Sequence, residues 1–150
     1  MNNEIIKYAK TLKASSTLTM LSNASAYLNH YLDDINWVGF YLFNGTKLIL
    51  GPFQGEVACE EIELGKGVCG NSALEKKSFV VPNVHEFPGH IACDSRSNSE
   101  IVVPIIINDK LYGVLDIDSP NYNRFGEEEK NILEQFVEII KEFVNVDKIY

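Results

Sequence analysis

The stretch Asn36-Trp-Val-Gly-Phe-Tyr-Leu-Phe-Asn-Gly45 decides the fold of this chain. Its aromatic and β-branched residues favour an extended strand. The Asn44-Gly45 dipeptide that ends it is a strong signal for a tight hairpin turn, and Lys47 to Leu50 supplies the returning strand. The sequence therefore predicts an antiparallel β-hairpin in the first third of the chain.

Further strands and helices are predicted on both sides of this hairpin. Strands are expected at Ser78 to Val81, Glu100 to Ile107 and Leu111 to Asp118, the last two joined by a turn at Asn108-Asp109. Helices are expected at Glu4 to Lys13, from an N-cap at Ser15 or Ser16 to Leu32, and at Asn71 to Lys77. The clearest helix carries the apolar stripe Ile132, Leu133, Phe136, Val137, Ile140, Phe143 and Val144, and Glu127 to Glu129 lie at its start. The fold class is therefore α+β, a central and mostly antiparallel β-sheet flanked by N- and C-terminal helices.

Composition limits the class of protein. The 150 residues are 45% hydrophobic and 23% charged, as in an ordinary globular protein, and without repeats or linkers they are expected to form one domain, 1–150. A net charge of −8 argues against sequence-independent binding to nucleic acid or to an anionic membrane. The N-terminus lacks the basic and apolar parts of a secretory signal, so a cytoplasmic location is expected, where thiols stay reduced.

Three cysteines lie beside glycines or other small residues. Cys93 lies in Phe87-Pro-Gly-His-Ile-Ala-Cys-Asp94, within a long irregular segment from Pro82 to Asn98, and loops of this length are often functional. Cys59 and Cys69 follow glycine-containing stretches in which the backbone is open to approach. Such positions suit thiols that change partner, although three small buried hydrophobic side chains remain the alternative.

A metal site is an alternative interpretation of the same segment. His85, His90 and Cys93 could supply three ligands of a zinc ion. Their spacing matches no common structural zinc pattern, and the chain has no Cys-x-x-Cys pair. We therefore expect no metal.

Two carboxylates lie on one face of the strand Leu111 to Asp118. Side chains alternate between faces in a strand, so Asp116 and Asp118 share one face and the apolar Leu115 and Ile117 share the other. Buried acids are costly unless paired, so together with Glu100 they could line a pocket for a ligand's ammonium group. Alternatively, Asp118 caps the turn that follows and Asp116 accepts from a backbone donor.

The hairpin strand offers an aromatic surface by the same alternation. Val38, Phe40 and Leu42 share the face that we expect in the core. Trp37 and Tyr41 share the other face, with Gly39 leaving space between the two rings. They could wall an apolar pocket, or they could pack as ordinary half-buried side chains.

Several blocks of sequence resemble the free methionine-(R)-sulfoxide reductases, a family of stand-alone GAF-domain enzymes. The three cysteines set this family apart from other GAF domains, and the block that ends after Cys93 is its most specific motif. The matching blocks cover the middle half of the chain: Gly51-Pro-Phe-Gln-Gly55, Gly67-Val-Cys-Gly70, Phe87-Pro-Gly-His-Ile-Ala-Cys-Asp94, Ser99-Glu-Ile-Val-Val-Pro104 and Gly113-Val-Leu-Asp-Ile-Asp-Ser-Pro120.

The resemblance implies a GAF-like fold and a role for each candidate residue. Cys93 matches the thiol that attacks the substrate sulfur, Cys59 the thiol that resolves the resulting sulfenic acid to a disulfide, and Cys69 a further resolving candidate. Glu100, Asp116 and Asp118 match carboxylates that hold the substrate ammonium and help to protonate its oxygen, and Trp37 and Tyr41 match the aromatic side of the pocket. The resemblance also implies thioredoxin as reductant, no metal or organic cofactor, and a homodimer. Tyr27, Leu28, Tyr31 and Leu32 could form its interface or belong to the core.

The expected chemistry agrees with these roles. A sulfoxide oxygen leaves readily only when protonated, and crowded carboxylates raise at least one pKa so that a proton is available. The same carboxylates, with Asp94, oppose a thiolate at Cys93, and a protonated His90 would offset them. The competing interpretations are a GAF-type sensor of a small ligand and a thiol redox sensor that uses Cys93 and Cys59 without turnover.

Overall fold

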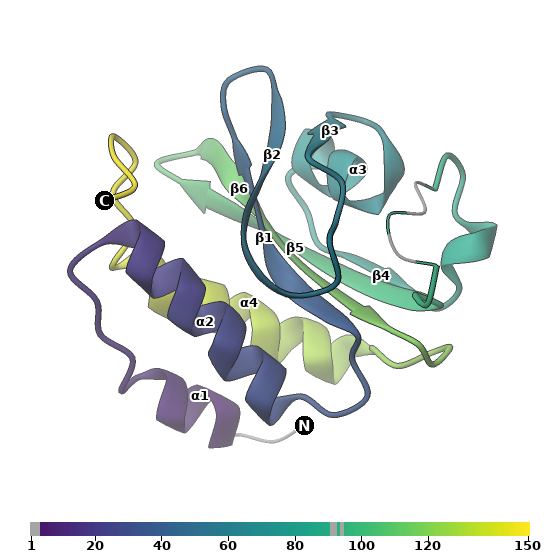
Figure 1. Ribbon diagram of the computed structural model, residues 1–150, viewed down its shortest axis with the longest axis horizontal. Coiled ribbons are helices and arrows are strands. Elements are labelled where there is room, and N and C mark those ends of the chain that lie inside the picture. Colours follow the sequence, from purple (N-terminus) through teal and green to yellow (C-terminus); the bar gives the residue numbers. More distant parts are fainter. Residues whose placement is uncertain (1–3, 91–92, 94) are drawn as a thin grey trace.

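A six-stranded antiparallel sheet forms the centre of the computed structural model, which describes residues 4–90, 93 and 95–150 (Figure 1). Its strand order is β3-β2-β1-β6-β5-β4. The elements along the chain are α1 (Glu4–Ala9), α2 (Thr17–Tyr31), β1 (Trp37–Phe43), β2 (Lys47–Gly55), β3 (Glu61–Glu63), α3 (Gly67–Glu75), β4 (Phe79–Val81), a 3-10 turn (Val84–Glu86), β5 (Ser99–Ile107), β6 (Lys110–Ser119) and α4 (Glu127–Lys141). The α+β prediction with its antiparallel sheet is confirmed.

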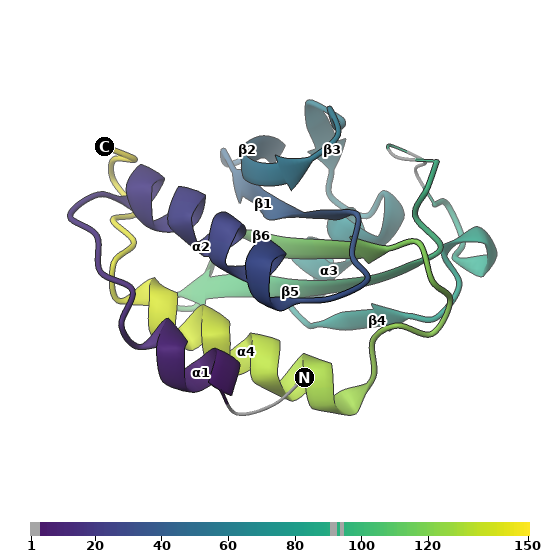
Figure 2. The same cartoon turned by 60° about the horizontal axis from the view of Figure 1, so that its bottom comes forward.

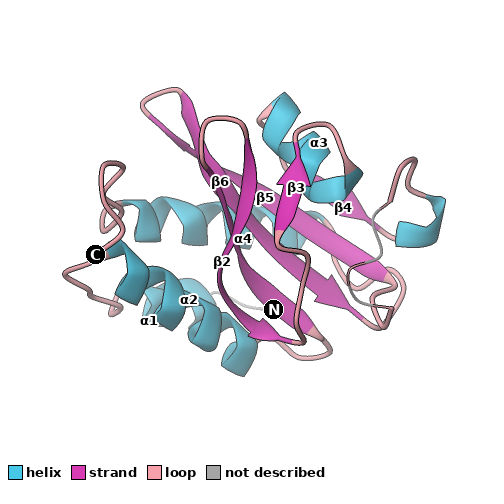
Figure 3. Cartoon of the chain, turned by 45° about the horizontal axis from the view of Figure 1, so that its top comes forward, coloured by secondary structure: helices cyan, strands magenta, loops and turns pink. Residues whose placement is uncertain are grey.

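Helices cover the two faces of the sheet unequally. α1, α2 and α4 gather on one side, and α3 lies on the other (Figures 2 and 3). The first side holds an apolar core in which Leu28 of α2 and Phe136 of α4 pack with Phe40, Leu115 and Ile117 of the sheet. A smaller cluster lies on the α3 side, and it includes Trp37, Tyr41 and Cys69.

The terminal helices begin as their sequences predict. Ser16 caps α2, and its Oγ accepts a hydrogen bond from the Thr19 amide at 3.2 Å. Gly126 precedes α4, and Glu129 Oε1 accepts from its amide at 2.7 Å. The acidic first turn of α4 complements the positive end of the helix. α1 ends at Ala9, earlier than the predicted Lys13.

Strand β2 extends beyond its predicted end at Leu50. It continues to Gly55, although Gly51 and Pro52 are poor strand formers. The pairing with β1 is irregular between Gly39 and Tyr41, and no cross-strand partner is recorded there for Gly51 or Pro52. The ladder therefore passes the proline without needing its missing N–H.

Helix α3 begins at Gly67, four residues before the predicted Asn71, and ends at Glu75 instead of Lys77. The predicted bounds of this helix were therefore wrong at both ends. A side chain at Gly70 would collide with the carbonyl oxygen of Glu63, so this glycine lets the helix approach the end of β3. Cys69 consequently lies in the first turn of a packed helix.

Among the described residues, no helix is long and apolar enough to cross a membrane.

Candidate functional site

Cross-strand pairing brings the candidate carboxylates and aromatic residues to one face of the sheet. Asp118 of β6 lies between Glu100 of β5 and Trp37 of β1. The next residue on this face, Asp116, lies opposite Gly39. Register alone therefore sets three acids and an indole side by side, although they come from three separate strands.

Two of these acids are buried. Glu100 and Asp116 are only 7% and 6% exposed, and Asp118 is half-buried. Burial and the neighbouring carboxylates raise the pKa of Glu100 well above its ordinary value, and burial also raises the pKa of Asp116. Asp116 Oδ1 is buried without a hydrogen-bond partner among the described residues. The cluster therefore retains protons and offers an acceptor to an incoming donor.

Cys69 belongs to this acidic cluster. Its Sγ lies 3.9 Å from Glu100 Oε2, and the side chain is 5% exposed. Burial, followed by the charges of Asp116 and Glu100, raises the pKa of its thiol well above the ordinary value. Cys69 is thus a protonated buried thiol in a helix, which agrees with the predicted alternative of a small buried side chain.

A disulfide joins the other two cysteines. Cys59 lies in the connection between β2 and β3, and Cys93 in the segment before β5. Their Cα atoms are 5.5 Å apart, and both residues are half-buried. The structure therefore pairs Cys93 with Cys59 and leaves Cys69 as a free thiol. Ile91, Ala92 and Asp94 of the cysteine motif lie outside the described residues. The expected effect of Asp94 on a thiolate at Cys93 therefore stays a prediction.

Trp37 and Tyr41 form the aromatic side of the site. Their rings stack with centroids 5.9 Å apart, and both residues are 2% exposed. A Cβ at Gly39 would lie 2.8 Å from Trp37 Cη2, so only glycine leaves room for the indole. The polar end of each ring is also used: Trp37 Nε1 donates to the Glu56 carbonyl at 3.1 Å, and Tyr41 Oη to the Cys59 carbonyl at 2.9 Å.

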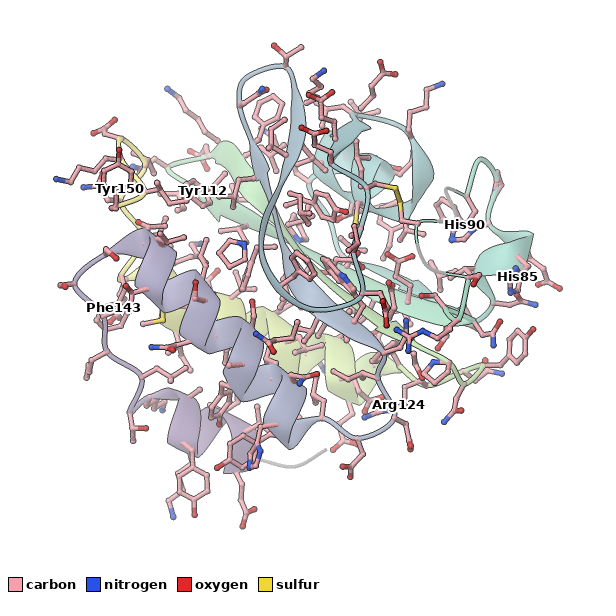
Figure 4. All side chains as sticks on the ribbon, viewed as in Figure 1. His85, His90, Tyr112, Arg124, Phe143 and Tyr150 are labelled. Carbon is pink, nitrogen blue, oxygen red and sulfur yellow. A yellow bond between two sulfur atoms is a disulfide. The ribbon has the colours of Figure 1, made fainter. Side chains whose placement is uncertain are left out.

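His85 and His90 lie at one end of the molecule, away from Tyr112 and Tyr150 (Figure 4). Their ring centroids are 6.3 Å apart, and His85 Nε2 is 2.8 Å from Asn98 Oδ1. Burial, and then the charge of His85, lowers the pKa of His90. These surroundings favour the neutral ring of His90, which would not offset the carboxylates near Cys93.

One pocket is lined by the three acids, the two aromatic rings, His90 and two of the cysteines. Sequence reasoning missed several of its walls, including Ala58, Ile62, Val68 and Ser97, because their types carry no chemical signal of their own. The residues that line the pocket are Trp37, Tyr41, Ala58, Ile62, Lys66, Gly67, Val68, Cys69, His90, Cys93, Ser97, Glu100, Asp116 and Asp118. The arrangement combines an apolar wall, an acidic floor and a disulfide.

Cation binding is the other property of the acidic floor. Ligand atoms of Cys69, Glu100 and Asp116 all lie within 4.8 Å of one another. This group differs from the His85, His90 and Cys93 set considered from the sequence. Because burial favours the protonated forms of these groups, a metal cation would have to displace their protons. An organic ammonium fits the cluster better, because it donates hydrogen bonds to carboxyl oxygens.

Known proteins resemble this chain over most of its length. The GAF domain model matches residues 8–141. The free methionine-R-sulfoxide reductase of Escherichia coli is 49% identical over 82% of this chain and 74% of its own length. The enzyme of the same name from Saccharomyces cerevisiae is 51% identical over 80% of this chain and 71% of its own length.

Solved structures agree with these relatives. The reduced form of Staphylococcus aureus fRMsr is 52% identical, with a TM-score of 0.91 over 94% of this chain and 93% of that one. The free methionine-R-sulfoxide reductase of Neisseria meningitidis, in complex with its substrate, is 36% identical, with a TM-score of 0.90 over 94% and 87%. The chain therefore belongs to the GAF-domain family and, within it, to the free methionine-R-sulfoxide reductases, which are oxidoreductases.

Proposed function

We propose that this protein reduces free L-methionine-(R)-sulfoxide to methionine, with Cys93 as nucleophile and thioredoxin as final reductant. The observation that carries the proposal is the Cys59–Cys93 disulfide beside a pocket floored by Glu100, Asp116 and Asp118. The names of the relatives from Escherichia coli and Saccharomyces cerevisiae, both free methionine-R-sulfoxide reductases, support this substrate.

The reaction balances in three steps. The Cys93 thiol attacks the sulfoxide sulfur, and the oxygen passes to Cys93, which leaves methionine and a sulfenic acid. The Cys59 thiol then attacks the sulfenic sulfur, so that a disulfide forms and water leaves. The thioredoxin dithiol finally reduces this disulfide and becomes a disulfide itself.

The buried carboxyls act as proton donors and as ammonium ligands. The raised pKa of Glu100 and of Asp116 keeps a proton near the sulfoxide oxygen, which leaves only when protonated. The free acceptor Asp116 Oδ1, with Asp118, receives the substrate ammonium. A peptide-bound residue brings no ammonium and would leave these groups unpaired, which accounts for selection of the free amino acid.

The apolar end of the substrate packs against Trp37 and Tyr41. The methyl group beside the sulfur is a small hydrophobic surface, and the stacked rings present an apolar wall of matching kind. The chemistry uses protein thiols and an external dithiol, so we expect a chelator to leave turnover unchanged.

Cys59 is the first resolving thiol in this proposal. It is already within bonding reach of Cys93, whereas Cys69 is buried in α3 as a protonated thiol. The test is mass spectrometry of Cys59→Ser after one turnover. A Cys69–Cys93 disulfide that forms in full yield would contradict this order.

The decisive experiment measures methionine released from the separate R and S epimers of free methionine sulfoxide, with thioredoxin as reductant. We expect turnover of the R epimer alone, and its loss in Cys93→Ser. Turnover of neither epimer would overturn the proposal and favour a thiol redox sensor, which forms the same disulfide with peroxide.

We also propose a homodimer in the cytoplasm, where a thioredoxin-dependent enzyme finds a reducing environment. Of the predicted interface residues, Leu28 and Leu32 are buried in the core, Tyr27 is half-buried and Tyr31 is exposed. Tyr8 and Leu18 add to the exposed apolar surface of the N-terminal helices. Sedimentation velocity at micromolar concentration should give twice the chain mass. A monomer would contradict the assembly and leave the activity untouched.

A further inference from the structure

The segment that carries Cys59 is attached to the sheet by two aromatic side chains of β1. Trp37 Nε1 donates to the carbonyl of Glu56 at 3.1 Å, and Tyr41 Oη donates to the carbonyl of Cys59 at 2.9 Å. The two hydrogen bonds hold the residues on either side of Val57 and Ala58, so the short segment 56–59 is fixed at both ends.

Val57 of this segment faces solvent, whereas Ala58 and Cys59 are half-buried. Val57 is 87% exposed, and residues 57–59 belong to no helix or strand. The next attachment is the hydrogen bond from the Leu50 amide to the Glu60 carbonyl at 3.0 Å. Cys59 thus lies between an exposed residue and the edge of the sheet, and the phenol of Tyr41 bonds directly to its backbone.

The phenol is a permanent donor. Burial, and then the charge of Asp116, raises the pKa of Tyr41, so the O–H stays protonated wherever thiols react. The side chain is 2% exposed, so water cannot readily replace the phenol at the Cys59 carbonyl. A buried donor that binds one backbone oxygen reduces the freedom of the residue that carries it.

We infer that Tyr41 is a positioning residue for the resolving step: its hydroxyl holds the Cys59 backbone so that the thiol faces Cys93. The inference rests on the proposed function and deepens it. Tyr41 touches neither sulfur in this role. It acts through Cys59 by raising the effective concentration of the resolving thiol at the sulfenic acid, where the Cys59 sulfur bonds to the Cys93 sulfur and water leaves.

The first test measures the equilibrium between the Cys59–Cys93 disulfide and dithiothreitol, in which the reagent dithiol is oxidised as the protein disulfide is reduced. Tyr41→Phe keeps the ring and removes the hydroxyl. We expect the equilibrium constant for forming the protein disulfide to fall about fivefold, the scale of one net hydrogen bond. This measurement needs no substrate, so it stands even if the protein reduces no sulfoxide.

Tyr112→Phe is the matched control. It removes a phenol hydroxyl from a half-buried tyrosine of β6, and that ring packs against the core on the helical side of the sheet. Figure 4 shows Tyr112 at the end of the molecule away from His90. We expect the disulfide equilibrium of this variant to match that of the parent protein. An equal fall in both variants, or no fall in Tyr41→Phe, would overturn the inference.

The second test follows single turnover of the reduced protein with methionine sulfoxide, and traps sulfenic acid with dimedone. In Tyr41→Phe, disulfide should lag behind methionine, and trapped Cys93 sulfenic acid should accumulate. A higher KM with disulfide still forming in step with methionine would mean that Tyr41 serves only as a wall of the pocket, and would overturn the inference.

Trp37→Phe provides a second variant should Tyr41→Phe fold poorly, which its thermal midpoint would reveal. It removes the bond to Glu56, three residues before the thiol, so we expect a smaller fall in the same equilibrium constant. An unchanged equilibrium constant in Trp37→Phe would then overturn the inference that these hydrogen bonds position Cys59.

Discussion

The two faces of strand β6 differ in what they bury. Leu115 and Ile117 point into an apolar core covered by α2 and α4, and both are fully buried. Asp116 and Asp118 alternate with them and point to the α3 side, where the Cys69 thiol and the Glu100 carboxyl line the same pocket. One face follows the rule for a stable core, and the other breaks it at the candidate site. Because side chains alternate between the two faces of a strand, one set of residues in β6 stabilises the core while the alternate set lines the candidate site.

The largest effect is expected when the acidic face is broken. Asp116→Ala and Asp118→Ala should lower kcat/KM for free methionine-(R)-sulfoxide, by about a thousandfold for Asp116, because the donor or the ammonium ligand is lost. Steady-state methionine release measures it. Asp33→Ala, at an exposed acid on another loop, is the control. Unchanged kinetics in both variants would remove the carboxylates from the pocket assignment.

The apolar face should respond in stability instead. Leu115→Ala leaves a cavity in the core and should lower the free energy of unfolding by about 3 kcal/mol. Urea denaturation of the oxidised protein measures the loss. Asp116→Ala, one residue away, should destabilise far less, since it removes a buried acid whose Oδ1 has no hydrogen-bond partner among the described residues. If the two variants lost equal stability, the division between the faces would fail.

Cys69 shows how closed the acidic face is. Burial raises the pKa of its thiol, so little thiolate exists at pH 8. In the oxidised protein, where Cys69 is the free thiol, iodoacetamide should react at least about tenfold more slowly than in the urea-unfolded chain. Equal rates, read by mass spectrometry, would place Cys69 in open contact with solvent.

The smallest effect concerns pH. Burial raises the pKa of Glu100, so between its unfolded and folded values the native state binds more protons than the unfolded chain. This contribution to stability is complete below the unfolded value and is lost as pH rises through the folded one. The parent protein should therefore lose more unfolding free energy than Glu100→Gln as the pH rises above the ordinary glutamate pKa. Parallel curves of unfolding free energy against pH would contradict it.

Local pattern predicted the sheet and the acidic face well. The alternation in β6 separates its acids from its leucine and isoleucine, and the Asn44-Gly45 turn marks the hairpin. The exact register was missed: the Asn108-Asp109 turn joins the two strands, but the irregularity between Ile105 and Ile106, which brings Glu100 opposite Asp118, carries no local signal. The start of α3 was missed because a glycine needed for close packing looks the same as a glycine in a loop.

The polar ends of the aromatic residues were also missed, although a signal existed. A tyrosine or tryptophan on a buried face needs a partner for its O–H or N–H, and the nearest backbone with free carbonyls is the connection after β2. The pairing of Cys93 with Cys59 was predicted from family resemblance, because the positions of three cysteines in a chain do not by themselves select one pair.

The Cys59–Cys93 bridge closes a covalent ring across a sequence separation of 34 residues, and β3, α3 and β4 all lie inside it. Closing a ring of that size restricts the unfolded chain enough to favour the native state by about 4 kcal/mol in the chain-entropy account. The oxidised protein is therefore the longer-lived form against heat and proteases. On the proposed mechanism, a shortage of reductant would leave the protein in this more stable, disulfide-bonded form.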